Sequence, residues 1–151
     1  MITLPPDPLC FIDTNIFLEL LLDQKRANEC ESLLELVSKG TVEAVVTHFT
    51  VHAIEACLGS GGNLETFLRN LEHSLGLFVY DTNISDEIAI SLVSKKIDRD
   101  FDDTLQYYVA KKLGVDSIVS FDEHFDGLDI KRVEPDELLR KPIRQHHESK
   151  H

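Results

Sequence analysis

Four acidic residues, far apart in the chain, stand beside predicted strand ends or on predicted helices. Asp13 ends an apolar run, Glu55 and Asp103 lie on predicted helices, and Asp122 follows the apolar segment 117–120. Each type of position has an ordinary structural role for an acid, as a cap, a turn former or a solvated helix residue. If folding gathers the four, their charges raise one another's pKa unless a cation holds them, and carboxylates suit Mg²⁺ and Mn²⁺.

The stretch 11–15, Phe-Ile-Asp-Thr-Asn, is the part of the chain around which this site would be built. We expect a strand over 9–13, because a continuous apolar run is typical of a strand buried on both faces. A helix over 14–22 follows this strand at once. Thr14 or Asn15 can cap that helix, and one of them can hold the Asp13 carboxylate by a hydrogen bond. In open α/β sheets the ligand lies just outside the carboxyl ends of the strands, where Asp13 stands.

The rest of the chain alternates between predicted strands and helices. We expect further strands over 42–47, 77–80 and 117–120, and a fifth, edge-like strand over 130–134. Helical periodicity predicts helices over 25–39, 48–58, 63–75, 85–96 and 101–113, and a short one from Pro135. This alternation predicts an α/β architecture with a central, mostly parallel sheet of about five strands flanked by helices. We expect one domain over residues 1–140 and a polar, flexible tail over 141–151.

Two of these helices have apolar positions that predict a buried face. In the helix over 48–58 the predicted inward residues are Phe49, His52, Ala53, Ala56 and Cys57, with Glu55 beside them. In the helix over 85–96 they are Ile88, Ala89, Leu92 and Val93. Asp103 is in the first turn of its helix, where the helix dipole stabilises an ionised carboxylate.

Composition excludes several classes of protein. The 27 acidic residues outnumber the 15 basic ones, and the formal charge of −12 disfavours non-specific binding to nucleic acid. The three cysteines have no C-x-x-C spacing, so we expect buried thiols in a reducing cytosol rather than disulfides or a zinc knuckle. The sequence shows neither a basic signal-peptide region nor an apolar stretch long enough for a membrane span. These features predict a cytoplasmic protein without a membrane partner.

The motifs resemble those of the PIN-domain nucleases, and among them the VapC-type toxin ribonucleases. They are Phe-Ile-Asp-Thr-Asn over 11–15, Glu55 on a helix after a Val-Val-Thr strand, Asp103-Thr104-Leu105, and Ser-Phe-Asp-Glu-His-Phe over 120–125. The resemblance covers residues from about 10 to 134 and implies a three-layer fold around a parallel sheet. It implies a ribonuclease that binds Mg²⁺ or Mn²⁺ and hydrolyses RNA phosphodiester bonds.

Carried over residue by residue, the resemblance makes Asp13, Glu55, Asp103 and Asp122 the catalytic and metal-binding residues. We expect Asp13, Asp103 and Asp122 to be direct or water-mediated ligands, and Glu55 to be a ligand or to orient the attacking water. Asn15, Thr14 and Ser120 would hold these acids in place by hydrogen bonds, with Ser120 standing where the family usually has Thr. Asp102 is the possible substitute for its neighbour Asp103, although Thr104-Leu105 favours Asp103.

The resemblance also implies partners: an RNA substrate, a second copy of the chain in a homodimer, and a small antitoxin protein. Lys95, Lys96 and Arg99 precede the acidic segment 98–103 and would flank the site, whereas Lys111 and Lys112 are ordinary solvated residues.

Three alternatives remain open. A PIN nuclease of this kind can be a housekeeping RNA-processing enzyme, and a PIN-like module can bind without catalysis. A haloacid-dehalogenase-like phosphatase also begins with a strand-end Asp, but it needs a second Asp two residues on, where this chain has Asn15.

Overall fold

The computed structural model describes residues 10–61 and 63–140. Five strands form one sheet in the order β3-β2-β1-β4-β5, and all neighbouring strands are parallel. They are β1 (Cys10–Ile12), β2 (Ala44–Thr47), β3 (Leu77–Tyr80), β4 (Ser117–Val119) and β5 (Lys131–Val133). This confirms the predicted α/β fold class. The predicted tail over 141–151 lies outside the described residues.

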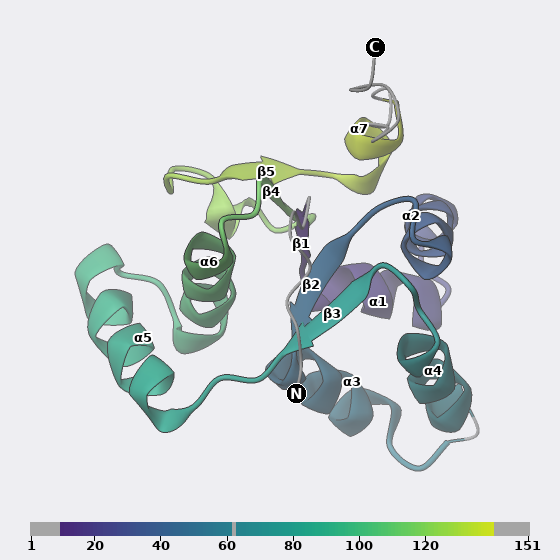
Figure 1. Ribbon diagram of the computed structural model, residues 1–151, viewed down its shortest axis with the longest axis horizontal. Coiled ribbons are helices and arrows are strands. Elements are labelled where there is room, and N and C mark those ends of the chain that lie inside the picture. The colour runs from purple at the N-terminus through teal and green to yellow at the C-terminus, as the bar shows by residue number, and fades with distance from the viewer. Residues whose placement is uncertain (1–9, 62, 141–151) are drawn as a thin grey trace.

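Helices lie on both sides of the sheet (Figure 1). In chain order they are α1 (Thr14–Leu21), α2 (Ala27–Lys39), α3 (His48–Leu58), α4 (Asn63–Glu72), α5 (Ile84–Ile97), α6 (Phe101–Leu113) and α7 (Pro135–Arg140). A short 3-10 helix, η1 (Glu123–Phe125), follows β4. None of the helices in the described ranges is long and apolar enough to cross a membrane.

The sheet separates two apolar cores, because successive strand residues point to opposite faces. Cys10, Ile12 and Val46 face one core, which α1, α2 and α4 cover. Phe11, Val45 and Ile118 face the other, which α5, α6 and η1 cover. Since both faces are buried, β1 and β2 are continuous apolar runs, whereas the edge strand β5 reads Lys-Arg-Val and buries only Val133.

The buried face of α3 differs from the prediction. Its buried residues are Thr50, Val51 and Ile54, whereas His52 and Cys57 are exposed. Thr50 points inward because its hydroxyl pairs with that of Thr14 on α1 at 2.9 Å. This contact between two helices helps to set the rotation of α3 about its axis. The spacing of apolar residues within α3 could not predict such a contact.

The predicted buried stripe of α5 is wrong in two of its four residues, since Ala89 and Val93 are partly buried but Ile88 and Leu92 are not. Ile88 and Leu92 are 59% and 63% exposed, and the buried residues of the helix are Asp86 and Ile90. The Asp86 carboxylate pairs with Lys112 of α6 at 2.7 Å and accepts a hydrogen bond from Tyr80 at 3.0 Å. These bonds turn the Asp86 side of α5 inward and leave an apolar stripe facing outward.

The carboxyl ends of the strands lie at one edge of the sheet. Asp13 follows β1, His48 follows β2, Asp81 follows β3 and Ser120 follows β4. Asp122 comes two residues beyond Ser120, where its side chain accepts the N–H of His124 and begins η1. The fold therefore brings residues from distant parts of the sequence to the edge where ligands of parallel sheets bind.

Candidate active site

Asp13 is the innermost acid of this edge. It is 5% exposed, and its backbone N–H continues the ladder by donating to Val119 O at 3.0 Å. Burial raises the pKa of Asp13 above its ordinary value, hydrogen bonds with the side chains of Ser120 and Gln106 oppose this rise, and the charge of Asp122 adds to it. A buried carboxylate with a raised pKa next to a second acid is typical of a functional site.

Ser120 connects Asp13 to Asp122. Its hydroxyl donates to Asp13 Oδ2 at 2.6 Å and accepts the backbone N–H of Asp122 at 2.8 Å. The Asn15 side chain also donates to Ser120 Oγ, at 3.4 Å. The hydroxyl of this fully buried serine therefore donates its proton to Asp13 and accepts from Asp122. It fixes the position of Asp13 relative to the segment that carries Asp122.

Asp103 reaches the same region from the first turn of α6. Asp100 caps this helix by accepting the Asp103 N–H at 3.0 Å. The pKa of Asp103 is raised to about 6, first by burial and then by the charges of Asp100, Asp122 and Asp13, while a hydrogen bond with His124 opposes the rise. These electrostatic partners place Asp103 close to both other aspartates.

Asp102 points elsewhere. It is exposed, and burial together with the charge of Asp100 raises its pKa without a contribution from Asp13 or Asp122. Of the two neighbouring acids, Asp103 is therefore the one that the structure brings to the other aspartates.

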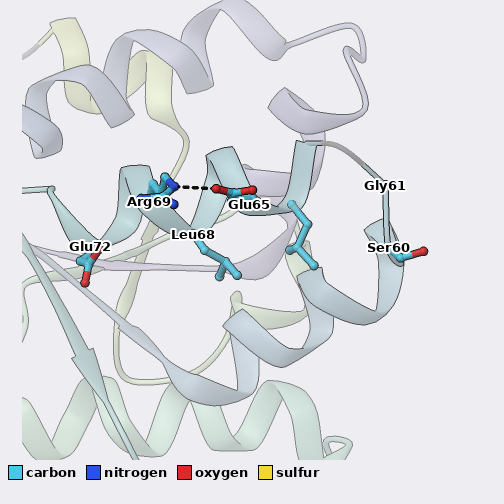
Figure 2. A pocket seen from close by; sticks show the side chains of 7 residues that line it. Ser60, Gly61, Glu65, Leu68, Arg69 and Glu72 are labelled. Carbon is cyan, nitrogen blue, oxygen red and sulfur yellow. Dashed lines mark hydrogen bonds and ion pairs between the residues drawn. The ribbon is translucent and has the colours of Figure 1, made fainter.

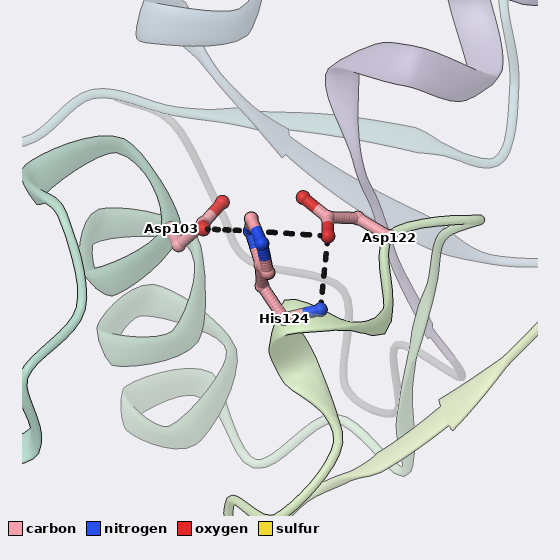
Figure 3. A group of neighbouring side chains, drawn as sticks. All are labelled: Asp103, Asp122 and His124. Carbon is pink, nitrogen blue, oxygen red and sulfur yellow. Dashed lines mark hydrogen bonds and ion pairs between the residues drawn. The ribbon is translucent and has the colours of Figure 1, made fainter.

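His124 lies between two of the acids (Figure 3). Its Nδ1 is 3.3 Å from Asp103 Oδ2 and 3.2 Å from Asp122 Oδ1, and its side chain is 71% exposed. Among the described residues, these three form the group whose ligand atoms all lie within 4.8 Å of one another. The sequence prediction did not include His124 as a site residue.

Glu55 is not in that group. Its carboxylate lies 2.9 Å from His52 Nδ1 on α3, and its side chain is 36% exposed. The His52 ring stacks on that of His48, which in turn faces Asp81 at 3.8 Å. Thr14 pairs with Thr50 rather than with Asp13 through its side chain. The roles given to Glu55 and Thr14 therefore stay predictions.

The polar atoms around Asp13 suit a bound cation. Within the described ranges, two buried side-chain oxygens have no hydrogen-bond partner, Asn15 Oδ1 and Gln106 Oε1. Unpaired buried carbonyl oxygens are costly, and a hydrated cation would satisfy them. Three carboxylates, one imidazole and two amides make an oxygen-rich donor set that suits a divalent ion which keeps some of its waters.

Gln106 is a second residue that sequence reasoning missed. It is 3% exposed and follows Asp103 by three positions, so the two lie on one face of α6. A polar residue among the apolar positions of this helix is the signal that could have found it. For His124, the Asp-Glu-His segment after β4 was interpreted only as a turn, although its histidine stands two residues from a candidate ligand.

A parallel sheet with aspartates converging at its carboxyl edge defines an α/β protein with an acidic site suited to a cation. The family model of the PIN domain matches residues 10–124. The chain belongs to the PIN-domain family, which confirms the resemblance seen in the sequence and overturns the phosphatase alternative. A comparison with curated proteins finds no match.

Solved structures share this fold at low sequence identity. VapC20 of Mycobacterium tuberculosis, described as a sarcin-ricin loop cleaving toxin, is 17% identical with a TM-score of 0.66, over 83% of this chain and 99% of that one. A toxin–antitoxin complex from Klebsiella pneumoniae is 13% identical with a TM-score of 0.64, over 83% and 97%. VapBC2 from Rickettsia felis, bound to a DNA fragment from its promoter, is 12% identical with a TM-score of 0.62, over 83% and 98%.

Proposed function

We propose that this PIN domain is a divalent-metal-dependent endoribonuclease. The observation that carries the proposal is the convergence of Asp13, Asp103 and Asp122 from three different elements at the carboxyl edge of the sheet. The pKa of Asp103, raised to about 6 by burial first and then by the charges of Asp100, Asp122 and Asp13, supports the proposal, because a cation held among these carboxylates would offset both effects. Mg²⁺ or Mn²⁺ is the ion that such oxygen ligands suit.

Asp13, Asp103 and Asp122 would hold the ion, and Ser120 and Asn15 would keep Asp13 in place. A bound divalent ion lowers the pKa of a coordinated water and stabilises the charge that grows on the phosphoryl oxygens. Glu55 remains the proposed fourth acid, as a ligand or as the group that orients the attacking water. Its bond to His52 gives it a defined starting position on α3.

RNA would approach past the segment that joins α5 to α6. Arg99 lies there and is held beside the site, because its Nε donates to the backbone carbonyl of His124 at 3.0 Å. Lys95 and Lys96 precede it in the last turn of α5. Lys112 is already paired with Asp86, and Lys111 with Asp129 at 3.2 Å, so the phosphate contacts of our proposal come from residues 95–99.

The test is cleavage of a structured RNA with and without Mn²⁺, alongside para-nitrophenyl phosphate. We expect cleavage of the RNA that needs Mn²⁺, and a loss of roughly 100-fold or more in Asp13→Asn and Asp103→Asn, because several kcal/mol of charge stabilisation depend on the ion. Asp102→Asn and the exposed Asp23→Asn remove the same charge outside the site and should stay close to wild type. Wild-type protein that cleaves neither substrate would instead support a non-catalytic binding module.

We further propose that this nuclease is the toxin of a toxin–antitoxin pair. An apolar groove of about 470 Å³ lies between α1, α2 and α4, and Phe17, Leu20, Leu34 and Leu71 are among its lining residues. Glu31 and Glu35 also line it, so the chemistry of its partner is that of an amphipathic helix with basic flanks. The solved relatives from Klebsiella pneumoniae and Rickettsia felis, a toxin–antitoxin complex and VapBC2, support such a partner.

The housekeeping alternative predicts a different outcome when the gene is expressed. A toxin arrests the growth of a bacterial host unless its antitoxin is present, whereas an RNA-processing enzyme does not. Growth arrest by the wild-type chain but not by Asp13→Asn would favour the toxin. Normal growth with an enzyme that is active in vitro would favour RNA processing.

The homodimer is proposed at the outward stripe of α5. Ile84, Ile88 and Leu92 are 71%, 59% and 63% exposed, and their spacing of four residues aligns them along the helix. Two α5 helices that pair antiparallel about a twofold axis would bury the two stripes against each other.

A further inference from the structure

We propose that His124 is itself a ligand of the divalent ion and that its imidazole biases the site toward a transition ion such as Mn²⁺ over Mg²⁺. This inference rests on the proposed metal dependence of the nuclease. It adds a nitrogen donor to a site that the sequence predicts from carboxylates alone.

The imidazole already occupies a ligand position. Its Nδ1 lies 3.3 Å from Asp103 Oδ2 and 3.2 Å from Asp122 Oδ1. Two atoms that each lie about 2.1 Å from one ion are at most about 4.2 Å apart, so both distances fit shared coordination. As Figure 3 shows, the ring nitrogen stands between the two carboxylates and does not turn away from them.

The backbone holds the ring in this place, although the side chain is 71% exposed. The N–H of His124 donates to Asp122 Oδ1 at 2.9 Å, and its carbonyl accepts from Arg99 Nε at 3.0 Å. Arg99 is itself anchored by a bond from Nη1 to Ile97 O at 3.1 Å. The Asp122 bond also caps η1, and together the two bonds fix the point from which the imidazole extends toward Asp103 and Asp122, as a ligand oriented before the ion arrives requires.

The chemical consequence is a preference between ions. Mg²⁺ is a hard cation that takes oxygen ligands and keeps its waters, so an imidazole contributes little to its binding. First-row transition ions bind imidazole more tightly. A set of aspartates with one histidine therefore favours Mn²⁺ more than a set of carboxylates would.

The experiment is pulsed electron paramagnetic resonance of Mn²⁺ bound to the full chain, in natural-abundance protein and in protein labelled with ¹⁵N-histidine. We expect a ¹⁴N coupling from a directly bound imidazole, replaced by a ¹⁵N coupling in the labelled protein. This readout needs no substitution, so a variant that fails to fold does not affect it. Mn²⁺ that binds without any histidine coupling would overturn the inference and leave the nuclease proposal standing.

Variants then assign the coupling to one histidine and separate a ligand from a mere counter-ion. In His124→Ala we expect the coupling to disappear and the preference for Mn²⁺ over Mg²⁺, measured by calorimetry, to fall about tenfold. His124→Lys places a positive charge but no imidazole at this position, and should lose the coupling in the same way. The exposed His73→Ala, just before β3 at the amino end of the sheet, is the matched control and should match wild type.

Each contrary result has a distinct meaning. A coupling that survives in His124→Ala, or a Mn²⁺ preference that survives in His124→Lys, would overturn the inference alone. A wild-type chain that binds neither Mn²⁺ nor Mg²⁺ would overturn it together with the proposed metal dependence of the nuclease.

Discussion

The hydroxyl of Ser120 is bonded to the buried carboxylate of Asp13 at 2.6 Å, across a gap of 107 residues in the sequence. Because the same oxygen accepts the N–H of Asp122, one small side chain sets the distance between two of the candidate ligands. A threonine at this position would present the same hydroxyl.

We therefore expect Ser120→Ala to weaken Mn²⁺ binding by about 10–100-fold and to destabilise the protein by about 1–3 kcal/mol, because a buried carboxylate and a backbone N–H lose their partner. Ser120→Thr should restore both. Calorimetry and urea unfolding measure the two effects. Full Mn²⁺ affinity in Ser120→Ala would show that the bond has no part in organising the site.

The raised pKa of Asp103, about 6 against 3.8 in an unfolded chain, predicts how stability depends on pH. Between these values the folded state binds more protons than the unfolded state, so this group stabilises the metal-free protein as the pH falls and destabilises it at neutral pH. Asp103→Asn should thus raise the melting temperature by about 2–6 °C at pH 7.5 and by much less at pH 4.

The affinity for a metal ion should fall as the pH falls, opposite to the trend in the stability of the metal-free protein, because ligands must be deprotonated before they bind an ion. Mn²⁺ affinity of the wild type should decline as the pH falls through about 6. Thermal melts of both proteins from pH 4 to 8, with and without Mn²⁺, test the two trends together. A metal-free Asp103→Asn protein that is no more stable than wild type at pH 7.5 would contradict the electrostatic argument.

The groove between α1, α2 and α4 predicts which surface an antitoxin would use. Leu34 lines this groove, and Leu68 lines a separate hollow on α4 that the ion pair between Arg69 and Glu65 borders (Figure 2). Both side chains are partly buried, so the two substitutions perturb similar environments.

If the chain arrests growth, co-expression of the antitoxin of our proposal should restore growth. Leu34→Glu should abolish that rescue because it places a charge in the apolar groove, and Leu68→Glu should not. Colony counts under induction measure this. Equal rescue of the two variants would place the antitoxin elsewhere on the surface.

The outward stripe of α5 predicts the oligomeric state. We expect sedimentation velocity to give a dimer for the wild type and a monomer for Ile88→Glu, since two charges would be buried at the twofold axis. Leu75→Glu is the matched control, because Leu75 is 80% exposed and lies away from α5, before β3. A monomeric wild type, or a dimer that survives Ile88→Glu, would argue against this interface.

Sequence patterns predicted most of the helices and strands, because each is marked by residues that lie close together in the sequence. The strand over 77–80 and the helix over 48–58 have the predicted bounds, since apolar runs and the residues that end them are read within a few positions. The predicted acids Asp13, Asp103 and Asp122 lie together because parallel strands with helical crossovers share one carboxyl edge.

The remaining features depend on contacts between distant segments. Helix α3 is rotated by the pairing of Thr50 with Thr14, and α5 by the pairing of Asp86 with Lys112. His124 joins the site because Arg99, 25 positions earlier, holds its carbonyl. The spacing of apolar residues within one helix gives no information about bonds to other segments. The buried faces of α3 and α5 and the position of His124 therefore could not be predicted from that spacing.

The place of β1 in the middle of the sheet has a consequence for synthesis. The strand leaves the ribosome well before one of its two neighbours, β4, which begins only at Ser117. Until then one edge of β1 has no strand beside it and Asp13 has no Ser120, so an incomplete chain cannot assemble the acidic edge. A growing polypeptide of this topology cannot form the candidate site until β4 and Asp122 have been translated.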